Sequence, residues 1–292
     1  METASHKYLI INADDFGLLP EVNQAIVECF KAGSITSTTL MVNTEGSADA
    51  VNLAEENPAL GIGFHFNLTQ GKPIEDPENI PSLVNSDGTF YSRREFEKRS
   101  ILGQIDRFDI EKEFKKQIEK VNEFNLDITH IDSHHHIHLF PTVFKIVSDY
   151  AIKNGLPLRV PWVVFDFIKA PMQFKAVKSL IRKVLLKTLI RQGSANALKG
   201  LVKPDKFLSI YDYIPIPLQI QAEHYLELLK SATSGITEVM VHPAYATTTL
   251  KYMFSDCQIK EQELAALCSF SFVKEAENNR FKVVSYRELT CN

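Results

Sequence analysis

Short apolar runs alternate with amphipathic segments along nearly the whole chain, and this alternation limits the fold more than any other feature. Strands are predicted at residues 8–12, 38–43, 61–67, 128–133, 158–162, 207–211, 238–241 and 282–286. Helices are predicted at residues 22–32, 48–56, 111–124, 141–154, 170–191, 219–231 and 261–277. Eight strands separated by helices favour an α/β fold, a distorted (β/α) barrel of the TIM type. An open, doubly wound sheet is the alternative.

Two segments interrupt this rhythm. Residues 71–106 form a polar stretch with several prolines, and residues 165–206 hold a basic helical stretch. Long insertions in a compact domain often act as lids or as walls of a binding site. Because no interdomain linker or internal repeat is visible, we expect residues 1–292 to form a single domain.

Composition excludes some functions and leaves others open. Of the 292 residues, 45% are hydrophobic, which is enough for a sizeable core, and the net charge of -4 gives no reason to expect nucleic acid as a partner. The four cysteines are far apart and no apolar run is long enough to span a membrane. These features, with no visible signal peptide, predict a cytoplasmic protein, and the frequency of symmetric oligomers predicts a homodimer.

Residues 129–138 hold five of the nine histidines of the chain. If this stretch were extended, His134, His136 and His138 would lie on one face, because side chains alternate along a strand. Neutral imidazole is a common ligand of transition metals. A catalytic zinc-type site needs only three protein ligands, so we expect some of these histidines to be structural, His130 and His135 first among them.

Two adjacent acids, Asp14 and Asp15, follow the first predicted strand. Either one could simply cap the helix that comes next, since aspartate is favoured at that position. On an extended segment, however, the two side chains point to opposite sides, so one could bind a metal while the other accepts a proton.

Side chains that could take part in catalysis or bind a metal also lie at the carboxyl ends of other predicted strands. These ends carry His65, Asn67, Asp132, Arg159 and His242. Barrel active sites form where the carboxyl ends of the strands meet. This convergence predicts a metal-assisted hydrolytic site, in which the metal lowers the pKa of a bound water and a carboxylate takes up its proton.

One aspartate and two histidines are a ligand set suited to Zn²⁺, which Co²⁺ or Ni²⁺ can replace. Mg²⁺ prefers oxygen ligands and is less expected, although it stays an option. The sequence therefore predicts one divalent metal ion, zinc or magnesium.

The motifs LIINADDFGL, SITSTTLMVN, LGIGFHFNLTQGKP, THIDSHHHIHLFP and EVMVHPAY occur in this order. In order and spacing they resemble the YdjC-like carbohydrate deacetylases, in particular the chitooligosaccharide deacetylases. The resemblance covers roughly residues 9–286 and is weakest between residues 165 and 217. It implies a distorted barrel related to the NodB-type polysaccharide deacetylases. The implied activity is metal-dependent removal of N-acetyl groups from N-acetylglucosamine oligosaccharides such as diacetylchitobiose.

The resemblance also implies roles for individual residues. The metal ligands would be Asp15, His65 and His134. Asp14 would be the base that activates water, and His242 the acid that protonates the leaving amine. Arg159 would orient Asp14 or bind substrate. The remaining candidates, expected to contact substrate or to support the ligands, are His136, His138, Asn67 and Asp132.

Two other readings compete with this one. Another amidohydrolase or a phosphoesterase could use paired histidines in a barrel, but these enzymes usually carry the pair on the first strand, and a phosphatase would need a more cationic site. A noncatalytic metal- or sugar-binding protein would not require both Asp14 and Asp15. The function must be decided at the site, because a fold alone does not fix it.

Overall fold

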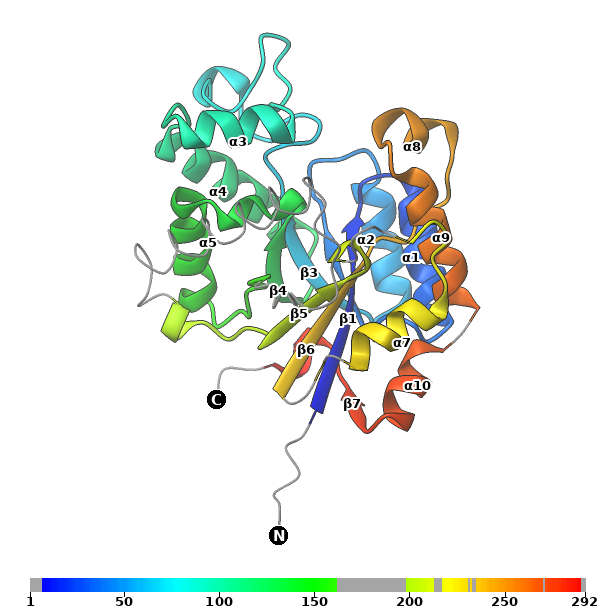
Figure 1. Cartoon of the computed structure of the whole chain (residues 1–292). Helices are drawn as coiled ribbons and strands as arrows, with labels where there is room; N and C mark the ends of the chain where they lie inside the picture. Colours follow the sequence, from blue (N-terminus) through cyan, green and yellow to red (C-terminus); the bar gives the residue numbers. More distant parts are fainter. Residues whose placement is uncertain are drawn as a thin grey trace.

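The computed structural model describes residues 7–161, 198–212, 217–230, 232, 235–269 and 271–289. Parallel strands occupy the centre and helices pack on both sides of them (Figure 1). The strands are β1 (Lys7–Phe16), β2 (Ser37–Leu40), β3 (Gly61–Phe66), β4 (Ile128–Ser133), β5 (Lys206–Ser209), β6 (Gly235–Val241) and β7 (Phe281–Val283). The α-helices are α1 (Pro20–Lys31), α2 (Ser47–Glu56), α3 (Arg93–Ile101), α4 (Arg107–Glu123), α5 (Pro141–Lys153), α7 (Ala222–Lys230), α8 (Thr248–Met253), α9 (Cys257–Cys268) and α10 (Phe272–Asn278). Short 3₁₀ helices are η1 (Pro77–Asn79), η2 (His134–Leu139), η3 (Ile210–Asp212) and η4 (Tyr286–Glu288).

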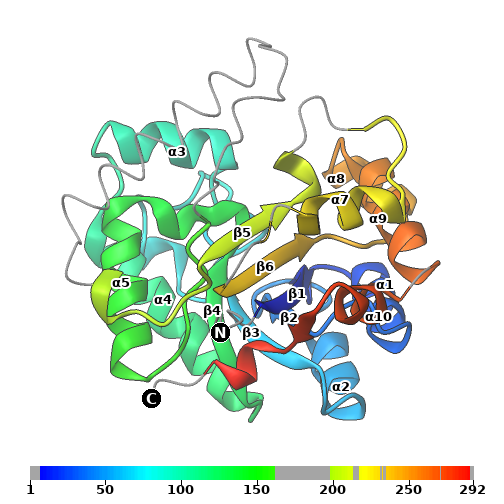
Figure 2. The same ribbon diagram turned by 60° about the horizontal axis from the view of Figure 1, so that its bottom comes forward.

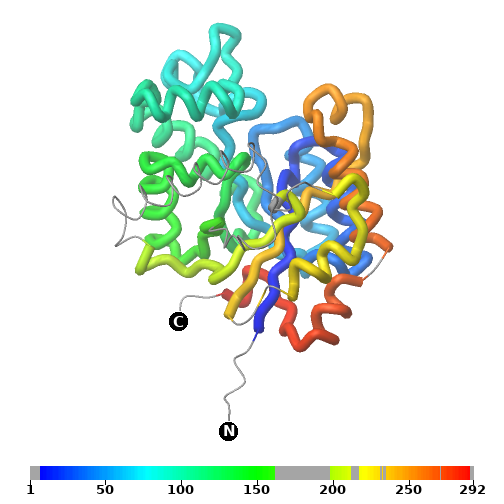
Figure 3. Tube along the Cα trace, viewed as in Figure 1, coloured from blue at the N-terminus to red at the C-terminus, as the bar shows by residue number. Residues whose placement is uncertain are grey.

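The sheet follows the order β4-β3-β2-β1-β6-β5, and β7 pairs with the start of β1. Every pairing between these strands is parallel. Helices α4 and α5 lie on one side of the strands, and α1, α9 and α10 on the other (Figure 2). Helix α9 packs against α1 although the two are far apart in sequence (Figure 3). The predicted α/β class is therefore confirmed.

The predicted strand at residues 158–162 is wrong in its described part, which forms only one bridge, between Leu158 and Ile131 of β4. Pro157 precedes this segment and Pro161 lies within it, and proline cannot donate a hydrogen bond to a neighbouring strand. The Leu158 amide donates instead to the Val202 carbonyl at 2.9 Å, just before β5. The segment thus links β4 to the residues that precede β5, at opposite ends of the strand order.

One helix prediction among the described residues is wrong, and two helices, α3 and α8, were not predicted. The single helix expected at residues 261–277 is two helices, α9 and α10, because the Ser271 side chain accepts a hydrogen bond from the Lys274 amide and starts a new helix. The insertion at residues 71–106 contains α3, whose Phe96 is buried and meets Phe140 edge to face. The helix expected at residues 170–191, and most of the second insertion, lie outside the described residues.

None of the described helices combines the length and apolar composition needed to cross a membrane.

Side chains of β1 alternate between two environments. Leu9, Ile11 and Ala13 belong to the large apolar core, whereas Ile10 packs separately with Tyr286. The polar residues Asn12 and Asp14 continue the Ile10 side of the strand, because every second residue shares a face. The sequence thus builds one apolar face beneath the helices and one face that becomes polar toward the carboxyl end.

Gly63 of β3 makes room for a buried aromatic stack. The His130 ring lies parallel to the Tyr286 ring, with centroids 3.6 Å apart and planes 7° apart. A Cβ atom on Gly63 would overlap the His130 ring, so only glycine fits there. This agrees with the structural role predicted for His130.

We expect Gly63→Ala to destabilise the protein by about 1–3 kcal/mol, the usual cost of overfilling a packed interior. Chemical unfolding at equilibrium measures the change. Gly200→Ala is the matched control, because its Cβ would meet Ile152 only at 3.5 Å, an ordinary contact. Equal stability of the two variants would contradict this account of Gly63.

Candidate metal centre

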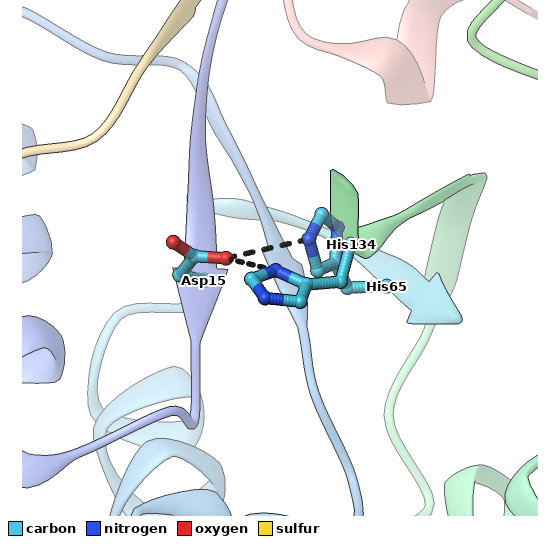
Figure 4. Close-up of side chains that lie close together, drawn as sticks. All are labelled: Asp15, His65 and His134. Atoms are coloured by element: carbon cyan, nitrogen blue, oxygen red, sulfur yellow. Dashed lines mark hydrogen bonds and ion pairs between the residues drawn. The ribbon is translucent and has the colours of Figure 1, made fainter. Parts of the chain in front are cut away.

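Asp15, His65 and His134 come together at the carboxyl end of the sheet (Figure 4). They arrive from β1, β3 and the first residue of η2, and all three are buried. Asp15 Oδ1 lies 2.8 Å from His134 Nδ1 and 3.5 Å from His65 Nε2. The three potential ligand atoms lie within 4.8 Å of one another, close enough to hold one metal ion.

The backbone at Asp15 is in the left-handed region, with φ 71°, and the pairing of β1 with β2 shifts register between Ala13 and Phe16. A non-glycine residue in this region is uncommon and often marks a functional site. Both Asp14 and Asp15 lie within β1, and neither caps α1, whose N-cap is Leu19 without a side-chain cap. The bend lets both carboxylates face the same buried site.

The histidine cluster is not extended, so the condition under which His134, His136 and His138 would share one face is not met. Strand β4 ends at Ser133, and the 3₁₀ helix η2 follows, with left-handed backbone at His135 and His136. The His135 ring still lies against the His134 ring, with centroids 3.8 Å apart, but the later histidines have partners other than Asp15.

Each later histidine has its own environment. His138 is buried; its Nε2 must donate to the Arg159 carbonyl at 2.9 Å, so its Nδ1 accepts from Ser133 Oγ at 2.5 Å. His135 Nδ1 lies 2.9 Å from Thr69 Oγ1. The His136 ring meets Phe207 edge to face at 5.6 Å. Among the described residues, none of them forms a hydrogen bond or an ion pair with Asp15.

Asp14 is held by Arg159 through two parallel hydrogen bonds. The guanidinium NH1 and NH2 groups donate to Asp14 Oδ2 and Oδ1 at 2.6 and 2.7 Å, and the Asn12 amide donates to Oδ1 at 2.9 Å. Burial acts to raise the pKa of Asp14, but the charge and hydrogen bonds of Arg159 outweigh it and hold the pKa below its usual range. Asp14 is therefore ionised at neutral pH.

Arg159 also contacts two further buried acids. It lies 2.5 Å from Asp132 Oδ2 and 2.6 Å from Glu238 Oε1. Glu238, which the sequence analysis did not single out, opens the EVMV run of β6 and also accepts from Tyr286 Oη at 2.6 Å. A charged residue facing the interior of an otherwise apolar strand was the signal that could have revealed it.

Asp132 links Arg159 to the group formed by Asp15, His65 and His134. Its Oδ1 lies 2.6 Å from His65 Nδ1, and Thr39 Oγ1 donates to its Oδ2 at 3.2 Å. Burial acts to lower the pKa of His65, but the Asp132 charge and hydrogen bond raise it to about 10. A carboxylate behind a ligand histidine fixes the orientation of its ring.

Lys260 of α9 is the second residue that sequence reasoning missed. Its Nζ lies 3.2 Å from Asp15 Oδ2, and the side chain is buried. Burial acts to raise the pKa of Asp15, but the charges of Lys260 and His134 lower it well below its usual value. The QIKEQEL context resembles a solvent-facing helix, so the sequence carries no signal for this contact.

His242 follows β6 and lies near Asp14. Its Nε2 lies 3.9 Å from Asp14 Oδ2, its ring meets Tyr211 edge to face at 5.3 Å, and its backbone amide donates to Glu263 at 3.3 Å. Burial lowers the pKa of His242 to about 4. The side chain is therefore neutral at neutral pH.

Asn67, expected to contact substrate or to support the ligands, lies in a dense set of hydrogen bonds just after β3. Its Nδ2 donates to Asn43 Oδ1 and to the Gln70 carbonyl, and its Oδ1 accepts from the amides of Thr69 and Gln70. These bonds shape the turn after β3, next to the metal cluster.

Comparison with known proteins places the chain in a family. The sequence profile described as YdjC-like protein matches residues 8–277. A carbohydrate deacetylase of Clostridium beijerinckii is 44% identical over 96% of this chain and 99% of its own length. The chain belongs to the YdjC-like family. A chitooligosaccharide deacetylase of Proteus mirabilis is 32% identical over 96% of this chain and 98% of its own length.

A solved structure supports the fold of this YdjC-like protein. The crystal structure of an Enterococcus faecalis V583 protein, named for cellobiose-phosphate cleavage, superposes with a TM-score of 0.78. It is 28% identical and covers 98% of this chain and 100% of its own. The family resemblance predicted from the motifs is thus confirmed.

We expect Arg159→Met to destabilise this YdjC-like protein by about 3–5 kcal/mol, because three buried carboxylates would lose their cation. Urea unfolding measures the loss. Arg93→Met is the control, because Arg93 pairs with Glu97 on the exposed face of α3 and such pairs contribute about 1 kcal/mol or less. A similar small change in both variants would show that Arg159 does not hold the site together.

Proposed function

We propose that this protein is a metal-dependent hydrolase that removes N-acetyl groups from N-acetylglucosamine oligosaccharides and releases acetate. The observation that carries the proposal is the separation of two adjacent acids. Asp14 pairs with Arg159, whereas Asp15 faces His65 and His134. A protein that only binds a metal needs the Asp15 group alone. A hydrolase needs that group and also a base, the position that Asp14 fills.

The residues at the cluster fit a metal ion. Asp15, His65 and His134 offer one carboxylate oxygen and two imidazole nitrogens, the donor set of many hydrolytic zinc sites. His134 Nε2 is buried and has no hydrogen-bond partner among the described residues. This set favours Zn²⁺, with Co²⁺ or Ni²⁺ as substitutes and Mg²⁺ less suited. The bound ion would polarise the acetamide carbonyl and lower the pKa of the attacking water.

Asp14 is the base in this proposal. It is ionised at neutral pH, and Arg159 and Asn12 fix the direction of its carboxylate. Because its pKa is held low, Asp14 is a weak base, and it accepts a proton only from water that has already been acidified. The oxygen of that water bonds to the carbonyl carbon.

His242 is the acid that completes the reaction. Nitrogen must gain a proton as its bond to the carbonyl carbon breaks. His242 starts neutral, so the proton that it donates must first reach it, and Asp14 is the adjacent source, with Oδ2 3.9 Å from His242 Nε2. We infer that the proton taken from water passes from Asp14 through His242 to the leaving amine.

The substrate class follows from the relatives. Proteins that match nearly the whole chain are named carbohydrate deacetylase and chitooligosaccharide deacetylase. We therefore propose a chitooligosaccharide such as N,N′-diacetylchitobiose as substrate. The single domain, the homodimer and the cytoplasmic location stay predictions.

We expect the purified protein to release acetate from N,N′-diacetylchitobiose, to lose this activity in a chelator, and to regain it when Zn²⁺ or Co²⁺ is added back. Enzymatic assay of free acetate measures the reaction, and cellobiose, which has no acetamide, is the control substrate. No acetate release with any added divalent ion would overturn the substrate assignment. Full activity after complete metal removal would overturn the metal dependence.

A further inference from the structure

Lys260 brings a positive charge into the buried site from a distant part of the chain. It lies on α9, 245 positions from Asp15, yet its Nζ is 3.2 Å from Asp15 Oδ2. The side chain is 6% exposed. Burying an ammonium group is costly unless it is paired, so this contact needs an explanation beyond surface packing.

The two oxygens of Asp15 have different partners. Oδ1 faces His134 at 2.8 Å and His65 at 3.5 Å, whereas Oδ2 faces Lys260. Lys260 therefore contacts Oδ2, the carboxylate oxygen that faces neither histidine. It fixes the rotation of the carboxylate and leaves Oδ1 directed at the cluster.

Lys260 and Arg159 divide the acids of the site between them. Arg159 contacts Asp14, Asp132 and Glu238 but makes no ion pair with Asp15 in the described part of the chain. Lys260 makes its ion pair with Asp15. When His65 is neutral, as a metal ligand must be, the four carboxylates exceed the two cations by two charges, which matches one divalent ion.

The other acids near Lys260 have partners of their own. Asp256 accepts a hydrogen bond from Tyr211 Oη at 3.2 Å, and Glu263 accepts from Tyr225 Oη at 2.7 Å. Neither forms an ion pair with Lys260 within the described residues. Asp15 is thus the acid that the ammonium group contacts directly.

We propose that Lys260 is a positioning residue that stands in for the metal charge: it holds Asp15 in its ligand orientation before the ion binds. The inference rests on the proposed metal site. A divalent ion on the same carboxylate comes close to the ammonium group and is repelled by it. Lys260 therefore stabilises the metal-free protein more than the metal-loaded protein. The site is preformed as a result, but it binds its ion less tightly than it would without Lys260.

The test compares metal-stripped wild type with Lys260→Met, Lys260→Arg and the control Lys145→Met, whose lysine pairs with Asp149 on the exposed face of α5. Competition with a chromophoric chelator gives the Zn²⁺ dissociation constant, and thermal unfolding gives the Tm with and without Zn²⁺. We expect Lys260→Met to bind Zn²⁺ at least about tenfold more tightly, because one like charge is removed. Its metal-free Tm falls, and the rise in Tm on adding Zn²⁺ exceeds that of wild type. Lys260→Arg and Lys145→Met keep the wild-type constant.

A purely structural lysine would lower both Tm values equally and leave the dissociation constant unchanged, and that result would overturn the proposal. Weaker Zn²⁺ binding in Lys260→Met would overturn it too. If metal-free Lys260→Met does not fold, Lys260→Gln keeps a donor without the charge, and the same tighter binding is expected. Failure of wild type itself to bind Zn²⁺ would refute the proposed metal site and this inference together.

Discussion

The buried guanidinium of Arg159 is the constraint on which the site depends. Its hydrogen bonds and ion pairs reach Asp14 on β1, Asp132 on β4 and Glu238 on β6. None of these acids could stay ionised in the interior without a cation, because an unpaired buried charge is strongly unfavourable. One side chain thus ties three strands together and sets the charge state of the proposed catalytic base.

The same arrangement separates the tasks of two neighbouring residues. Asp14 pairs with Arg159, whereas Asp15 contacts His65, His134 and Lys260. The left-handed backbone at Asp15 makes this separation possible within one strand. Local backbone strain at such a position is tolerated because the surrounding contacts hold it in place.

Local patterns predicted the parts of this structure that depend on neighbouring residues. Strand and helix periods gave the α/β class, and motif order led to the ligand candidates Asp15, His65 and His134, which the fold does bring together. Long-range contacts were harder to predict: Glu238 and Lys260 reach the site only through packing between distant elements. The histidines after Ser133 do not share one face, because the left-handed residues His135 and His136 turn the chain there. Periodicity carries no information on such a turn.

The central claim is that the two adjacent acids have separate tasks, and the most direct test is to measure metal content and turnover together in Asp14→Asn and Asp15→Asn. Both substitutions keep the side-chain shape and remove one charge. Asp14→Asn should retain one bound ion per chain by elemental analysis while acetate release falls about 10²–10⁴-fold, the usual contribution of a general base. Asp15→Asn should lose both the ion and the activity. Loss of the ion in Asp14→Asn, or full metal content in Asp15→Asn, would contradict the account.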